Sequence, residues 1–403
     1  YYVINDTGST DNTIQIINEF FAEKNIPGEV VVHEFRTCTC HKGLYKKYSF
    51  FHFGWNRTYA LELCAGKSEY IWVIDADDLP MGDFIIPQNL TADSYMLRIG
   101  QNFTYMRNQI FKNDTALAWH YVGPLHEYPT TKKANATCEA IKGDYFIDSR
   151  RMGARSANPN KYLNDAKVFE EFFPDDPNKD RNIFYCAQSY FDHGDTRKSI
   201  EMYQRRIAMG KWYEEVYYSY YRIAEGLERL EEPWHKIEQA YLDAYNFCKD
   251  RAEPLCRIAT HYRIQNDFQK CYSYAKKGAT IPYPEKCLLF ITKDVYTYKC
   301  KDELAIAAHY LGKYLESYSI CKQLLDSNSV PDHEIERIKA NMISSEAKLN
   351  DKNKKMCCFY LGNELLSQDY DIYNIIDHCK KYFKVIVIGN KIDPSGLENV
   401  LCF

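Results

Sequence analysis

The stretch AQSYFDHGDTRKSIEMY, residues 187–203, has the pattern of two helices that meet at a glycine. Ala187 and Tyr190 lie before Gly194, and Ser199 and Tyr203 follow it. Similar sets recur as Ala224, Leu227, Leu230 and Tyr241, then as Ala259, Tyr262, Cys271 and Ala275, and more weakly as Ala307, Tyr310 and Ser319. Residues 182–350 are therefore predicted to form helical hairpins in series.

The spacing of the alanines at 187, 224 and 259 is close to the period of about 34 residues of a tetratricopeptide hairpin. Small residues let paired helices approach closely, and each hairpin covers its apolar face only against the next. An all-α tetratricopeptide-type solenoid is the prediction, and an irregular helical bundle is the alternative. The tyrosines of a concave repeat surface could bind a peptide or partner protein, although packing alone also explains aromatic residues there.

Residues 1–150 alternate strand and helix patterns, which predicts an α/β domain. The pattern gives a strand at 1–4, a turn at 6–13, a helix at 14–21, a strand at 29–35 and an apolar run at 70–74 typical of a parallel strand covered on both faces. We expect an upstream strand and helix to be missing from this numbering. Residues 151–181 are predicted to be a linker helix, and residues 351–403 the start of a further α/β domain.

Length and charge exclude several classes of protein. A chain of 403 residues exceeds the roughly 250–300 residues of a single hydrophobic core, so at least two domains are expected. A formal net charge of −4 gives no electrostatic case for binding nucleic acid. No uncharged apolar run approaches the roughly 18 residues of a membrane span, so none is predicted.

The cysteines and the glycosylation motifs point to different compartments. The 15 cysteines are scattered without a framework spacing, which is typical of reduced core thiols. Asn-x-Thr motifs, which would argue for secretion, occur at Asn5, Asn56, Asn89, Asn102, Asn113 and Asn135. Because a glycan on Asn5 or Asn56 would block the active site predicted below, we favour a reducing, cytoplasmic compartment.

Asp75, Asp77 and Asp78 directly follow the apolar run at 70–74. Carboxylates at the carboxyl end of a parallel strand lie where open α/β sheets bind ligands. Two carboxylates two residues apart, a DXD motif, can hold Mg²⁺ or Mn²⁺ and leave positions open for phosphate oxygens. The alternative is a solvent-exposed turn, since Asp also favours turns.

Two further segments strengthen the metal hypothesis. Asp6 ends an earlier predicted strand before Gly8 and a helix N-terminus, which suits close approach to phosphate. Asp11 is better explained as a cap of that helix. Asn56 and Arg57 begin the helix that leads to the acidic strand, and an arginine there can hold a diphosphate through two hydrogen bonds. A surface salt bridge is the alternative for Arg57.

The order of these motifs, DTGSTDNT, WNRT, IWVIDADD and then WHYVGPLHE at 119–127, resembles the family 2 glycosyltransferases of GT-A fold whose catalytic domain precedes tetratricopeptide repeats. The resemblance implies a Rossmann-like domain and a metal-dependent, inverting hexosyltransferase. Asp75 and Asp77 would hold Mn²⁺ or Mg²⁺, and Asp6, Asn56 and Arg57 would lie near the nucleotide of a UDP- or GDP-sugar. The acceptor would be a hydroxyl of a protein or glycan.

Adjacent residues in an extended loop point to opposite sides, so His126 and Glu127 are assigned different roles. His126 is predicted to reach the metal or diphosphate, which would favour Mn²⁺. Glu127 is predicted to be the general base, and Asp77 is the other residue assigned to catalysis. A structural hydrogen-bonding role is the alternative for both His126 and Glu127.

Two function classes follow. The main hypothesis is a glycosyltransferase whose repeats recruit the acceptor, a partner protein or a second copy of the chain. The alternative is a non-catalytic repeat adaptor with a degenerate transferase domain. Cys38, Cys40 and His41 could suggest zinc, but no second ligand pair has suitable spacing. The basic, aromatic segment 42–48 is either a loop over the donor or a solvated loop.

Overall fold

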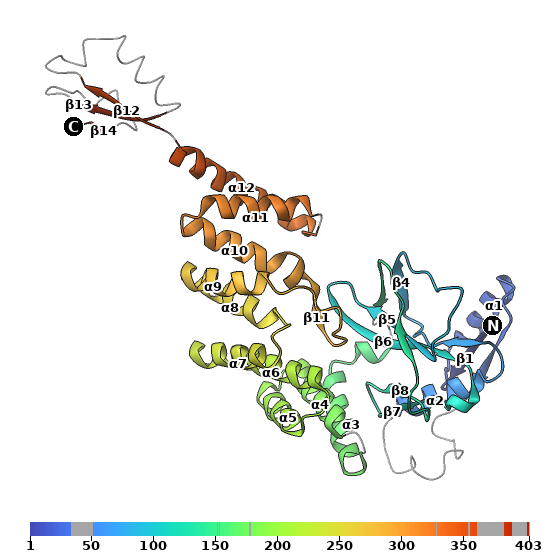
Figure 1. Cartoon of the computed structure of the whole chain (residues 1–403). Helices are drawn as coiled ribbons and strands as arrows, with labels where there is room; N and C mark the ends of the chain where they lie inside the picture. The colour runs from blue at the N-terminus through green and yellow to red at the C-terminus, as the bar shows by residue number, and fades with distance from the viewer. Residues whose placement is uncertain are drawn as a thin grey trace. The chain divides into compact units, whose positions relative to one another are not determined.

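The computed structural model describes residues 1–33, 51–150, 152, 154–176, 179–327, 329–353, 355–360, 383–388 and 401–402. The chain divides into two compact units (Figure 1). The first contains Tyr1–Ile258 and Thr280–Tyr296, and the second contains Ala259–Ala279 and Thr297–Phe403. The predicted zinc segment 38–41 and the segment 42–48 lie outside the described residues. The domain boundaries predicted at 150, 181 and 350 stay predictions.

The chain begins with a small parallel strand pair. Strand β1 (Tyr2–Asp6) pairs with β2 (Gly28–Val32), and helix α1 (Thr13–Glu23) connects them. Helix α2 (Phe53–Leu63) then packs against the hairpin of β7 (His120–Val122) and β8 (Tyr128–Thr130). The strands predicted at 1–4 and 29–35 and the helix predicted at 14–21 are thus close to observed elements.

A larger sheet follows, with the strand order β11-β6-β5-β10-β4. Its strands are β4 (Asp78–Gly82), β5 (Ser94–Ile99), β6 (Phe103–Lys112), β10 (Tyr145–Ser149) and β11 (Ile291–Thr292). Strands β3 (Tyr70–Trp72) and β9 (Cys138–Ala140) pair with β6 and β5. Leu97 and Ile147 are fully buried in the core of this sheet.

The prediction that the strand before Asp75 is a parallel strand covered on both faces is wrong. Strand β3 pairs antiparallel with β6, and Tyr70, Ile71 and Trp72 are each half-buried rather than covered on both faces. The pairs β5–β6, β10–β4 and β11–β6 are also antiparallel. The strand-rich region is therefore a mixed sheet of mostly antiparallel pairs, and it does not show the predicted GT-A Rossmann-like sheet.

The helices form a solenoid of successive hairpins, as predicted. In the first unit α3 (Lys161–Phe172), α4 (Lys179–His193), α5 (Thr196–Met209), α6 (Tyr213–Arg229) and α7 (Trp234–Phe247) each pack on the next. The boundary between the units falls within α8 (Glu253–Ile264). In the second unit α9 (Phe268–Ala279), α10 (Cys300–Tyr310), α11 (Tyr314–Asp326) and α12 (Asp332–Asn353) continue this pattern.

The recurring small residues lie where helices touch. Ala187, Ala224, Ala259 and Ala307 are fully buried. The Ser199 hydroxyl of α5 donates to the Ala187 carbonyl of α4 over 2.8 Å, which a larger residue at either position would prevent. The offset from the start of α4 to the start of α6 matches the tetratricopeptide period of about 34 residues.

The described C-terminal residues form a small parallel sheet of β12 (Lys355–Tyr360), β13 (Phe383–Ile388) and β14 (Leu401–Cys402). That residues 351–403 begin a further α/β domain stays a prediction. The nine cysteines from Cys64 to Cys321 are free, and most of them are buried. Among the described helices none has the length and apolar character needed to cross a membrane.

Replacing Ala187 with Leu should destabilise the first unit. Overpacking of a fully buried site costs about 1–3 kcal/mol of unfolding free energy. The matched control is Ala208→Leu, at an exposed position of the neighbouring helix α5, which should change stability by less than about 0.5 kcal/mol. Urea unfolding followed by tryptophan fluorescence measures both, because all 5 tryptophans lie in the first unit. Equal effects of the two changes would contradict the packing described for α4 and α5.

His52 predicts a pH dependence of stability. Its Nδ1 accepts the backbone N–H of Trp55 over 3.0 Å at the start of α2, and burial lowers the pKa of His52 to about 4. An unfolded histidine has a pKa of about 6.5, so the unfolded chain takes up the proton first as the pH falls. Stability is complete above pH 6.5 and is lost between about pH 6.5 and 4, by about 2 kcal/mol at pH 5.

The variant His52→Asn separates this effect from those of the other histidines. Asparagine can also accept the Trp55 N–H as a helix cap but does not titrate. Urea unfolding at pH 8 and pH 5 should show a smaller loss for the variant than for the wild type. An identical loss in both proteins would refute the role of His52.

Candidate functional site

The structure brings three of the predicted site residues together in one ion-pair network. Arg57 of α2 donates from Nη2 to Asp75 over 2.5 Å and from Nε to Glu127. Arg107 of β6, which the sequence did not single out, pairs with Asp75 at 3.3 Å. Burial would raise the pKa of Asp75, but the Arg57 and Arg107 guanidiniums hold it below its usual value. These carboxylates are therefore neutralised by the protein's own arginines.

Asp6 and Asn56 have local partners. The Asp6 carboxylate accepts the N–H groups of Gly8 and Ser9 over 3.0 and 2.9 Å and the Ser9 hydroxyl over 2.5 Å. These bonds hold the pKa of Asp6 below its usual value, although its burial acts in the opposite direction. Asn56 is buried and donates to the His52 carbonyl over 2.9 Å. The side chains of Asp6 and Asn56 thus each form hydrogen bonds with the backbone of their own segment.

Asp77 and His126 lie apart from this network. The Asp77 carboxylate accepts the backbone N–H of Met152 over 2.8 Å. The His126 ring stacks on Tyr185 with the ring centroids 4.3 Å apart. The described residues contain no group of three or more His, Cys, Asp or Glu placed to hold a metal ion, so Asp75, Asp77 and His126 do not form one there. The site roles and the Mn²⁺ or Mg²⁺ assignment stay predictions.

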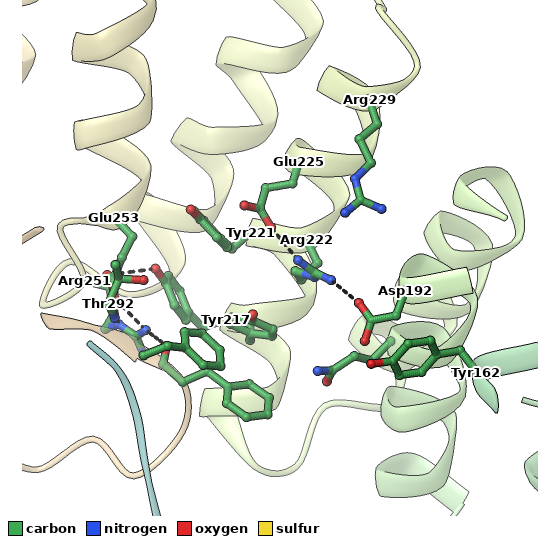
Figure 2. Close-up of a pocket in the computed structure, with 14 residues that line it drawn as sticks. Tyr162, Asp192, Tyr217, Tyr221, Arg222, Glu225, Arg229, Arg251, Glu253 and Thr292 are labelled. Carbon is green, nitrogen blue, oxygen red and sulfur yellow. Dashed lines mark hydrogen bonds and ion pairs between the residues drawn. The ribbon is translucent and has the colours of Figure 1, made fainter. Parts of the chain in front are cut away.

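A pocket of about 500 Å³ lies beside the first helical hairpins, within the first unit. Figure 2 draws the 14 side chains that line it. Helix α6 supplies Tyr217, Tyr218, Tyr221, Arg222, Glu225 and Arg229, and helix α4 supplies Gln188 and Asp192. The others are Phe103, Tyr162, Arg251, Glu253, Phe290 and Thr292. Spacings of three and four residues along α4 and α6 bring these side chains onto one face of each helix.

Arg222 joins the two helices at the pocket (Figure 2). Its guanidinium donates to Glu225 of α6 over 2.9 Å and to Asp192 of α4 over 3.3 Å. It also lies 3.5 Å from the centroid of the Phe191 ring. Arg222 is thus held by two carboxylates and an aromatic face, so its charge is already compensated.

Arg229, one helical turn beyond Glu225, differs from Arg222 in its partners. It lies 3.6 Å from the Phe191 ring centroid and donates to the Phe191 carbonyl over 2.8 Å. Arg229 is an exposed residue, and its guanidinium makes no ion pair with any residue that the structure describes. Arg229 therefore offers this pocket a positive charge without a carboxylate partner.

Arg251 and Glu253 close the inner end of the pocket as a buried ion pair. The Arg251 Nη2 donates to Glu253 over 2.8 Å and to the Phe290 carbonyl over 2.6 Å. Tyr296 and Tyr217 donate their hydroxyls to Glu253 over 2.6 and 3.4 Å. Although Glu253 is buried, Arg251 holds its pKa below the usual value. These groups satisfy one another and form part of the scaffold.

The tyrosines give the pocket an apolar but hydrogen-bonding wall. Burial raises the pKa of Tyr217, Tyr218 and Tyr221, so their phenols stay neutral at physiological pH. The one signal in the sequence that pointed to this pocket was the tyrosine content of the predicted concave repeat surface, for which packing was the other explanation. Nothing in the spacing alone identified Arg229, because its lack of a carboxylate partner is a property of the folded chain.

Comparison with known proteins finds no matching family model and no matching curated protein. Solved structures with similarity include the MamA protein, at 15% identity over 41% of this chain and 82% of that chain with a TM-score of 0.32. YrrB, described as a TPR protein with an unusual peptide-binding site, has 12% identity over 47% and 84% with a TM-score of 0.31. A putative kinesin light chain from P. anserina, with nearly identical TPR-like repeats, has 11% identity over 43% and 97% with a TM-score of 0.28.

The prediction of a family 2 glycosyltransferase is wrong. The strand before Asp75 pairs antiparallel rather than in the predicted parallel setting, and no family model and no curated protein matches. The prediction of a glycosyltransferase enzyme is wrong on the same findings, and nothing found supports a nucleotide-sugar partner. The helical-repeat part of the fold prediction is confirmed.

Proposed function

We propose that this chain is a non-catalytic, partner-binding repeat protein and that the pocket beside α4 and α6 receives a peptide segment of the partner. The observation that carries the proposal is a cavity of about 500 Å³ lined in part by neutral tyrosines, with Arg229, which makes no ion pair with a described residue, on the same helix face. This volume lies within the range of about 300–1,000 Å³ that is usual for ligand pockets.

The lining defines the chemistry of the peptide. Tyr218, Tyr221 and Phe290 offer aromatic surface to an apolar side chain, and aromatic residues are enriched at binding hot spots. Arg229 offers a charged donor to a carboxylate beside that side chain. The segment that fits is therefore an aromatic or aliphatic residue next to an aspartate or glutamate.

Filling the pocket should weaken peptide binding without unfolding the protein. In Gln188→Tyr a larger side chain on α4 would occupy the cavity, and Gln239→Tyr on an exposed face of α7 is the matched control. Peptides would be selected from a random display library with the whole protein, and their affinities measured by fluorescence polarisation. We expect the change at residue 188 to weaken binding at least about tenfold, which corresponds to about 1.4 kcal/mol. Equal affinities of the wild type and this variant would refute the pocket as the site.

Reversing the charge of Arg229 tests whether this residue binds a carboxylate of the peptide. Arg229→Glu should weaken binding of acidic peptides about tenfold, because a charge-assisted hydrogen bond is replaced by repulsion. Arg197→Glu, at an exposed arginine of α5, should change the affinity less than about twofold, since exposed charges at a distance are screened. Peptides whose affinity is insensitive to the first change would show that Arg229 does not contact them.

A further inference from the structure

A second cavity, of about 510 Å³, lies in the strand-rich part of the first unit. Helix α2 lines one side, and the end of β6 and the short helix η2 (Thr115–Leu117) with the residues after it line the other. The lining residues used below are Leu61, Glu62, Ile71, Lys112, Trp119 and Lys132. None of them belongs to the pocket beside α4 and α6.

Specific hydrogen bonds build the wall of this cavity. The Asn113 side-chain amide donates to the carbonyls of Cys64 and Ser68 over 2.8 and 2.9 Å, which ties the end of β6 to the chain that leaves α2. On the opposite side the Lys132 N–H donates to the Leu117 carbonyl over 3.2 Å. The cavity therefore exists before any ligand binds, which lowers the entropy cost of binding.

Trp119 forms the aromatic floor. Its ring packs on Phe111 with centroids 5.1 Å apart, and it joins the small core that contains Leu61 and Ile71. The Trp119 Nε1 atom is buried and has no hydrogen-bond partner in the part of the chain that the structure describes. Because that atom is closed to water while the cavity is empty, a ligand would meet the face of the indole ring rather than its N–H.

The positive charge at this cavity comes from Lys112 and Lys132. Neither ammonium group makes an ion pair with a residue described here, whereas the neighbouring Lys133 pairs with Asp93 over 2.8 Å. The carboxylates that also line the cavity are Asp114, which accepts the Ala116 N–H over 2.9 Å as a helix cap, and the exposed Glu62. Lys132, Asp114 and Glu62 are exposed, so water screens their charges, whereas Lys112 is half-buried and is the least screened of these charges.

We propose that this cavity binds a small aromatic carboxylate. Its ring lies against Trp119, Leu61 and Ile71, and its carboxylate pairs with Lys112 and Lys132. The site is separate from the peptide pocket, so its occupancy does not depend on the function proposed above.

A pair of probes that differ only in charge tests the proposal on the wild-type protein. Naphthalene-1-acetate should bind, and the neutral naphthalene-1-acetamide should bind at least about tenfold more weakly, since it loses the charge-assisted bonds. Binding is followed by ¹⁹F NMR of the whole chain labelled with 5-fluorotryptophan. The resonance of Trp119, assigned with Trp119→Phe, should shift while those of the other tryptophans stay in place. Equal shifts from the two probes, or none at Trp119, would overturn the proposal.

Charge-removing variants add a second readout. The double variant Lys112→Met, Lys132→Met keeps the length of both side chains and should weaken binding of the acid at least about tenfold. Lys142→Met, at an exposed lysine in the loop between β9 and β10, is the control and should bind as the wild type does. Glu62→Gln should strengthen binding of the acid, because it removes the repulsion. Unchanged affinity in the double variant would also overturn the proposal.

Discussion

The buried ion pair between Arg251 and Glu253 connects the parts of the first unit. Arg251 is 1% exposed and Glu253 is 2% exposed, so each would be costly to bury without the other. Arg251 also donates to the carbonyls of Leu289 and Phe290, which hold the segment 280–296 against the helices. Phe290 has a left-handed φ of 48°, a strained conformation for a residue with a side chain, and these contacts stabilise it.

The segment 280–296 contacts both the mixed sheet and the helices. Its strand β11 pairs with β6, so it extends the mixed sheet, while the Phe290 ring stacks on Phe103 and lies against Tyr218 of the solenoid. The pocket beside α4 and α6 exists because helices and a returning segment meet around this ring. Its lining therefore comes from stretches of chain far apart in sequence.

The solenoid could be predicted from the sequence because the pattern that indicates it lies within short stretches of the chain. Small residues such as Ala187 recur with the period of a helical hairpin, and each hairpin packs mainly on its neighbours. Whether the strand at Tyr70 pairs parallel or antiparallel depends on a segment distant in sequence, because its partner is β6. An apolar run alone does not distinguish these two kinds of pairing. The partner of Asp75 was hidden for a related reason, since Arg107, which neutralises Asp75, comes from that same strand. Asp6 and Asn56 make local hydrogen bonds, and their predicted roles near a nucleotide stay predictions.

The hydrogen bonds of Asn113 have a consequence for covalent modification. Oligosaccharide transfer to an Asn-x-Thr motif requires the asparagine amide nitrogen to be free, yet both of its hydrogens here bond to the Cys64 and Ser68 carbonyls. Asn56 likewise donates inward from a buried position. In the folded chain these two sugar-attachment motifs are closed to the transferring enzyme, whatever compartment the protein occupies, whereas Asn89, Asn102 and Asn135 are exposed.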